Sequence, residues 1–365
     1  MWYPTKYGAE DILGAMNLIT PETILAALSI VRKGIVYDLS HDLDQDMPIP
    51  GFHGAFFANT QFTLENGAEW HDRHLGIMKN GYSAQNLRIS MSDHSGTHID
   101  QLNHVGIKQP NGEYLIYNGI RNRDVIDTFG TKKLGIETMP PLITRGILID
   151  VAGFKDVEYL DAGYAIQPTE LDSALADQGT QVKKGDTVLV HTGWGRLWND
   201  PAKTLSGEPG LGRACAKWAV DHEIICWGCD QLGTDPFPFE TEGEALPMHL
   251  EMLTKAGIRL MENIYMEEIV KQKIYEFCLF AAPLKIKGGT ASPIRLLALI
   301  CTHYRCYEGR RPEPYFAQAD TIRVQVMLLL LCSMTPCQRE CSDGSLPRSH
   351  APPGPSPPHR VSLHP

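Results

Sequence analysis

Residues 92–104 read SDHSGTHIDQLNH and carry four possible metal ligands at even positions, namely His94, His98, Asp100 and His104. Imidazole nitrogen and carboxylate oxygen together form a ligand set that suits zinc or manganese. In an extended chain, alternate side chains point to the same face. Any one of these histidines is more often a residue that makes local hydrogen bonds. Four ligand-type residues in this spacing predict a metal site.

A straight strand cannot bring these side chains to one ion. At about 3.3 Å per residue, His94 and His98 would lie roughly 13 Å apart along a straight strand. Gly96 lies between them, and glycine accepts backbone angles that are closed to other residues. We therefore expect a strand, a turn at Gly96, and a second short extended piece.

The same residues carry a family resemblance. The pattern His-x-Gly-Thr-His-x-Asp-x-x-x-His fits residues 94–104 and resembles the signature of the cyclase family of metal-dependent hydrolases, which includes bacterial kynurenine formamidase and isatin hydrolase. Residues 10–18, 37–41 and 288–295 are similar to flanking segments of that family. The resemblance implies an α/β fold, a swivelling β/β/α domain, and a homodimer or homotetramer.

The resemblance also implies a role for each candidate residue. His94, His98 and Asp100 correspond to the ligands of a first metal ion, and Asp100 would bridge to a second ion held by His249 and Glu262. His104 corresponds to the catalytic acid/base. From the residues alone, His249 is a histidine in a helix and Glu262 a carboxylate after a strand-like turn. Both would more often be structural.

The expected chemistry is hydrolysis of a small amide or lactam, arylformamidase-like or isatin-hydrolase-like, and the first of these would place the chain in tryptophan catabolism. One or two divalent ions would activate water as the nucleophile, and His104 can move protons because histidine titrates near neutral pH. Residues 191–195 read HTGWG and lack the Gly-x-Ser-x-Gly pattern of a serine hydrolase. A metal-dependent lyase or dehydratase, a lactone hydrolase and a non-catalytic metal-binding module are the alternatives.

Three aromatic residues are candidates for substrate binding. Phe52 follows Ile49-Pro50-Gly51, where small formamidases resemble one another in having Trp-Pro-Gly, so it is a possible replacement for that tryptophan. Trp194 and Trp198 either line a pocket for a flat ring or pack in the core, and core packing is the more common arrangement.

Composition restricts the remaining possibilities. The chain has 365 residues and a formal net charge of −10, which argues against nucleic-acid binding. No apolar stretch approaches the roughly 20 residues that span a bilayer, and the N-terminus shows no secretory signal. We expect a soluble cytoplasmic protein that acts on a small molecule, without nucleic-acid or membrane partners.

A change in composition near residue 301 predicts the domain organisation. Residues 301–365 contain seven arginines, no lysine, five cysteines and ten of the 25 prolines. A segment of this kind cannot bury a core and is expected to be disordered. Residues 1–300 are then the catalytic domain.

Within residues 1–300, helical and strand patterns alternate, which favours a mixed α/β domain. A helix is expected from the Thr20 cap to Gly34, and further helices over 169–178 and 247–256. Strands are expected over 34–39, 86–90, 146–151 and 187–191. Cys226 and Cys229 form a CxxC in a strand-like segment, and we expect two core residues there rather than a redox or zinc site.

Overall fold

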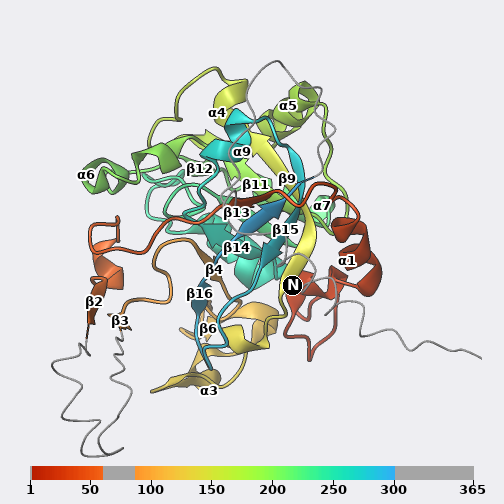
Figure 1. Cartoon of the computed structure of the whole chain (residues 1–365). Helices are drawn as coiled ribbons and strands as arrows, with labels where there is room; N and C mark the ends of the chain where they lie inside the picture. The colour runs from red at the N-terminus through yellow and green to blue at the C-terminus, as the bar shows by residue number, and fades with distance from the viewer. Residues whose placement is uncertain (1, 61–86, 301–365) are drawn as a thin grey trace, which may run out of the picture. The chain divides into compact units, whose positions relative to one another are not determined.

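The computed structural model describes residues 2–60 and 87–300, and a nine-stranded mixed sheet forms its centre (Figure 1). Strands β9, β11, β13 and β14 are parallel, and every other pair in this sheet is antiparallel. In sheet order the strands are β1 (Val36–Asp38), β17 (Leu297–Leu299), β15 (Glu276–Ala281), β9 (Leu142–Asp150), β11 (Thr187–His191), β13 (Cys226–Cys229), β14 (Arg259–Glu262), β4 (His98–Asp100) and β16 (Ala291–Pro293).

The central strands are buried on both faces. In β11, Val188 and Val190 belong to one buried apolar cluster and Leu189 to another, and β9 repeats this alternation over residues 147–149. Because successive side chains of a strand point to opposite faces, an unbroken apolar run identifies a strand that is covered on both sides. The sheet is thus the middle layer of an α/β fold, as the sequence predicts.

Helices cover the sheet, and small strand pairs lie outside it. Leu171 and Leu175 of α5 and Trp218 of α7 pack in the same cluster as Val188. The α-helices are α1 (Pro21–Leu28), α3 (Asn122–Val125), α4 (Val151–Phe154), α5 (Pro168–Gln178), α6 (Pro201–Thr204), α7 (Cys215–Asp221), α8 (Pro247–His249) and α9 (Glu267–Lys271). The outlying pairs are β2 (Phe57–Thr60) with β3 (Leu87–Ser90), β5 (Ile107–Lys108) with β6 (Tyr114–Leu115), β7 (Ile126–Asp127) with β8 (Gly130–Thr131), and β10 (Ala165–Ile166) with β12 (Gly210–Leu211).

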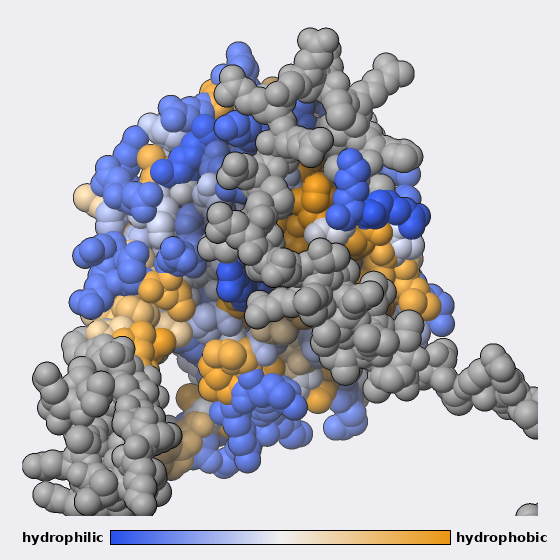
Figure 2. Space-filling view, viewed as in Figure 1, coloured by the Kyte–Doolittle hydropathy of each residue, from blue (hydrophilic) through white to orange (hydrophobic). Residues whose placement is uncertain are grey.

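The remaining helical segments are short 3₁₀ helices and one π-helix. The 3₁₀ turns are η1 (Gly14–Leu18), η2 (Gly51–His53), η3 (Tyr117–Gly119), η4 (Ile136–Thr138) and η5 (Trp194–Leu197). The segment η6 (Leu250–Ala256) is a π-helix that continues α8. Figure 2 shows hydrophilic residues over much of one face of the described chain, with hydrophobic residues exposed in smaller groups between them.

The first helix begins where the sequence predicts and ends earlier. The Thr20 side chain accepts a hydrogen bond from the Thr23 amide, which caps α1 in front of Pro21. The helix stops at Leu28 rather than at Gly34, because the amide of Arg32 already bonds to the carbonyl of Ile300. This tertiary contact takes the chain out of the helical path before the glycine is reached.

The other predicted elements are present with small shifts in their ends. Gly179 at φ +66° ends α5 and Gly257 at φ +70° ends the π-helix, so both glycine stop signals are confirmed. Cys226 and Cys229 of β13 are both fully buried free thiols, as expected for core residues. The predicted tail, residues 301–365, lies outside the described residues. Within the described parts, no helix combines the length and apolar character that crossing a membrane requires.

Candidate metal centre

Strand β4 supplies the two central residues of the candidate centre. His98 and Asp100 alternate along this strand and therefore point to the same side, and both are buried. The antiparallel neighbour β14 pairs Glu262 directly with His98. Side chains of such a pair leave the sheet about 5 Å apart. The register of these two strands thus brings together ligand-type residues that are distant in the sequence.

A turn at Gly96 precedes β4. Gly96 has φ +63°, and its carbonyl accepts hydrogen bonds from His98 Nδ1 at 2.9 Å and from Asn263 Nδ2 at 3.1 Å. A Cβ added at Gly96 would lie 2.2 Å from Leu43 Cδ2, so an alanine here would be strained by its backbone angle and would also have to displace the Leu43 side chain. The predicted sequence of strand, turn and short strand is confirmed.

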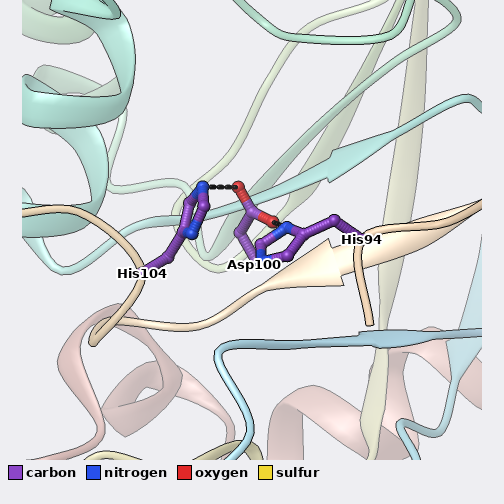
Figure 3. A group of neighbouring side chains, drawn as sticks. All are labelled: His94, Asp100 and His104. Carbon is purple, nitrogen blue, oxygen red and sulfur yellow. Dashed lines mark ion pairs between the residues drawn. The ribbon is translucent and has the colours of Figure 1, made fainter. Parts of the chain in front are cut away.

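The turn brings His94 back to the β4 carboxylate. Its Nδ1 lies 2.9 Å from Asp100 Oδ1, and its Nε2 lies 3.1 Å from the Thr290 hydroxyl. Figure 3 shows the His94 and His104 side chains on either side of Asp100. The Nε2 of His104 lies 3.9 Å from Asp100 Oδ2, and the rings of His94 and His104 are 4.1 Å apart. The His104 side chain is 21% exposed, whereas that of Asp100 is fully buried.

His249 enters from the short helix α8. Its Nε2 lies 3.4 Å from Asp100 Oδ2 and 3.3 Å from Glu262 Oε1. On the other side of the ring, Nδ1 lies 2.6 Å from Asp235 Oδ2, and the Asp235 carboxylate also accepts the amide of Met248 at 2.7 Å. A carboxylate that holds one nitrogen of a histidine and leaves the other free is a recurrent support for metal-binding histidines.

Electrostatics within the cluster favour charged carboxylates. Although burial opposes ionisation, the neighbouring imidazoles of His104, His94 and His249 hold the pKa of Asp100 well below its usual value. Burial likewise opposes protonation of His98, but the Asp100 and Glu262 carboxylates, each 3.4 Å from its Nε2, raise its pKa to about 10. Burial lowers the pKa of His104 to about 4, so this imidazole is neutral at pH 7. The buried carboxylates therefore attract positive charge to the space between these residues.

The residues present fit a divalent metal ion. Both carboxylate oxygens of Asp100 and the Nε2 of His98 are buried without a hydrogen-bond partner in the described chain. Leaving such atoms unpaired costs about 1–3 kcal/mol each, and more for charged groups. They face nitrogen and oxygen atoms at 2.9–3.9 Å without the alignment of hydrogen bonds. A cation among these nitrogen and oxygen ligands would satisfy all three atoms.

The predicted ligands and the predicted acid/base residue thus lie in one cluster. The groups of close ligand atoms within it differ from the two ligand sets that the family resemblance implies. One group of mutually close ligand atoms comes from His94, Asp100 and His104, and a second from His98, Asp100 and Glu262. Asp100 belongs to both groups. The assignment of individual ligands to one ion or two remains a prediction.

The three aromatic candidates lie in different surroundings. Trp194 is 3% exposed and packs on Tyr159, the core arrangement that the sequence left open. Trp198 is also buried and stacks on His41 at 4.0 Å. Phe52 is 85% exposed.

Several neighbours of the cluster were missed by sequence reasoning. The ring of His53 stacks on His94 at 5.2 Å and contacts Phe52 at 4.4 Å. Asp93 accepts the Thr290 amide at 2.9 Å and so joins the histidine turn to the segment before β16. Asp93 precedes His94 in the sequence and His53 follows Phe52, so their position beside candidate residues could have indicated both. Asp235 has no such signal, because only the fold brings it to His249.

Comparison with known proteins shows which family this chain belongs to. The model of the Cyclase family matches residues 37–236. Isatin hydrolase of Roseibium aggregatum is 27% identical over 220 residues, which cover 58% of this chain and 73% of the relative. Cyclase-like protein 3 of Oryza sativa subsp. japonica is 26% identical over 229 residues, 61% of this chain and 68% of the relative.

Solved structures share the fold. The crystal structure of a cyclase superposes with a TM-score of 0.71 at 27% identity, covering 80% of this chain and 96% of the other. Isatin hydrolase A from Ralstonia solanacearum has a TM-score of 0.53 at 22% identity over 77% of this chain and 98% of its own, a likeness of fold alone. Since the family match spans more than half of the sequence and includes residues 94–104, this chain belongs to the Cyclase family.

Proposed function

We propose that this chain is a metal-dependent hydrolase that cleaves a carbon–nitrogen bond of a small amide or lactam. The observation that carries the proposal is the set of buried, unpaired ligand atoms on Asp100 and His98, enclosed by further nitrogen and oxygen ligands. The relative named isatin hydrolase supports the bond class, because isatin contains a lactam.

The ion, zinc or manganese, would be held by His94, His98, Asp100, His249 and Glu262. When bound, a divalent ion supplies a Lewis acid and lowers the pKa of water towards about 7. Neighbouring residues that are not ligands fix the positions of the ligand side chains. Asp235 orients His249, and the amide and hydroxyl of Thr234 donate to Glu262 Oε1 at 2.8 and 3.1 Å.

His104 is the proton-transfer residue in this proposal. It is neutral at pH 7 because burial lowers its pKa, so it can accept a proton from water. It can then return the proton to the leaving nitrogen, which would otherwise depart as an unstable anion. Its partial exposure, in contrast to the buried Asp100, supports a role on the side of the cluster that a substrate can reach.

The exposed side of the cluster also suggests where an aromatic substrate would bind. Phe52 contacts His53, which in turn stacks on His94. A flat ring placed against Phe52 would lie beside the metal ligands. Of the three aromatic candidates, Phe52 is therefore the one we assign to substrate binding.

The test is a screen of the purified chain, reconstituted with Zn²⁺ or Mn²⁺, against formamides, lactams and lactones in ¹⁸O-labelled water. We expect metal-dependent turnover of an amide or lactam with one solvent oxygen in the acyl product. The Asp100→Asn variant should be inactive. Asp177→Asn, which neutralises an exposed carboxylate on α5, is the matched control and should keep full activity.

Other outcomes would replace the proposal. Turnover without solvent oxygen in the product indicates a lyase or dehydratase, and turnover restricted to lactones indicates a lactone hydrolase. A chain that binds metal stoichiometrically and turns over none of these substrates would fit a non-catalytic binding module.

A further inference from the structure

Another group of possible metal ligands lies in a different part of the fold and shares no residue with the centre around Asp100. The Nε2 of His191 and carboxylate oxygens of Asp230 and Glu267 lie within 4.8 Å of one another. His191 ends β11, Asp230 follows β13, and Glu267 begins α9. Open α/β sheets bind ligands beyond the carboxyl ends of their parallel strands, and this is where His191 and Asp230 lie.

His191 is held in the same way as His249. Its Nδ1 lies 2.7 Å from Asp150 Oδ1, and this carboxylate also accepts the amide of Gly153 at 2.9 Å. The opposite nitrogen, Nε2, then points to Glu267 Oε1 at 3.0 Å and Asp230 Oδ2 at 3.8 Å. A histidine with one nitrogen fixed by a carboxylate and the other among carboxylate oxygens has the arrangement of a metal ligand.

Asp230 and Glu267 each direct one carboxylate oxygen to His191, while the other oxygen binds a different neighbour. Asp230 Oδ1 accepts the amide and hydroxyl of Thr192 at 2.9 and 2.7 Å, while its Oδ2 accepts only a longer bond, 3.3 Å, from the Gly195 amide. Glu267 Oε2 pairs with Arg196 at 3.0 Å, which leaves Oε1 to face the imidazole.

The charge around His191 is unbalanced. Asp150, Asp230 and Glu267 surround it, and Arg196 is the cation that pairs with one of them. These three carboxylates and one guanidinium leave an excess of two negative charges around a histidine that is 1% exposed, before any charge on the imidazole is counted. Buried carboxylates require a compensating cation.

A cavity borders one residue of this group. A space of about 530 Å³ is lined by Arg196, Tyr265, Glu267, Glu268, Val270 and Lys271. Glu267 belongs both to the cavity wall and to the ligand group, so the cavity reaches one of the three proposed ligands.

We propose that His191, Asp230 and Glu267 bind a divalent transition-metal ion at a second site, separate from the centre around Asp100. Mixed imidazole and carboxylate ligands suit zinc, manganese or cobalt. The ion would be held by Nε2 of His191 and by one carboxylate oxygen each of Asp230 and Glu267. Because this site closes the ends of β11 and β13 onto α9, its effect is on the stability of that region.

The experiment uses Co²⁺ as the probe and counts ions per chain by equilibrium dialysis and elemental analysis. Glu267→Gln should bind one ion fewer than the wild type. Glu268→Gln removes a neighbouring carboxylate of the same cavity wall that is not a ligand, and should bind as many ions as the wild type. A His98→Ala, Asp100→Asn double variant, which disables the first centre, should still bind one ion.

A crystal of the wild-type chain soaked in Co²⁺ gives a second, independent measurement. We expect an anomalous difference peak beside His191 Nε2 that is absent in Glu267→Gln. Equal ion counts in the wild type and Glu267→Gln, or no peak at His191 in the soaked crystal, would overturn the proposal. The wild-type comparison decides the question even if the double variant does not fold.

Discussion

His98 and Glu262 face each other across strands β4 and β14, with His98 Nε2 3.4 Å from Glu262 Oε2. His98 also lies 3.4 Å from Asp100, and Glu262 lies 3.3 Å from His249. The cross-strand pair therefore connects Asp100 with His249. The sheet itself therefore sets the positions of the ligands. Rigid strands hold such groups more precisely than loops do.

Replacing His104 with glutamine tests its role in proton transfer. His104→Gln should lower kcat by about 10²–10⁴-fold, the usual contribution of a general acid/base. Metal content should remain at the wild-type level if His104 is not a ligand. A variant that loses metal along with activity would instead show that His104 belongs to the ligand set, as its proximity to His94 and Asp100 allows.

Replacing Asp235 tests the support of His249. Asp235 holds His249 Nδ1 and the Met248 amide, and both contacts fix the ring. Asp235→Asn should weaken metal binding by about 10–100-fold, the usual effect of losing an outer partner of a metal ligand. Competition with a chelator measures this affinity. Activity at saturating metal should recover substantially, and unchanged metal affinity would contradict the assigned role.

Replacing Gly96 tests the turn that brings His94 back to Asp100. Gly34 is the matched control, because it has the same φ of +63° but no atom within 4 Å of an added Cβ. Gly34→Ala should lower the free energy of unfolding by about 1–2 kcal/mol through backbone strain alone. Gly96→Ala adds the clash with Leu43 and should cost more, with reduced metal content. Denaturant unfolding measures both, and equal losses would show that the clash is relieved.

We expect the carboxyl group of Asp186, which lies outside both candidate metal sites, to make the stability of the fold depend on pH. Burial raises its pKa to about 6, against the opposing hydrogen bond from the Lys183 amide and the charge of Arg145. The folded state therefore holds this proton more tightly than the unfolded state, and stability falls as pH rises from about 4 to 6.

The variant Asp186→Asn isolates this contribution. Relative to the variant, the wild type should lose up to about 3 kcal/mol across that pH interval, since each unit of pKa corresponds to about 1.4 kcal/mol. Urea unfolding at several pH values gives the difference between the two chains. A difference that does not change between pH 4 and 6 would show that the pKa of Asp186 is not raised.

Local sequence determined the features that depend on neighbouring residues. The spacing of His94, His98 and Asp100 around Gly96 predicted both the ligand group and the turn, and Thr20, Gly179 and the apolar runs predicted most helices and strands. Hydrogen-bonded caps, backbone angles and side-chain alternation act over a few residues, so a single sequence reveals them.

Only the tertiary structure decided which distant residues meet. The register of β14 against β4 brings Glu262 to His98, and the packing of α8 brings Asp235 and His249 to the same centre. The group around His191 is assembled in the same way, from the ends of separate elements. Strand pairing and helix packing depend on contacts between segments far apart in the chain. No local pattern in one sequence encodes them. Residues 92–104 by themselves therefore predict a metal site, whereas His249 and Glu262 are expected there only from the family resemblance, and Asp235 is brought to His249 only by the fold.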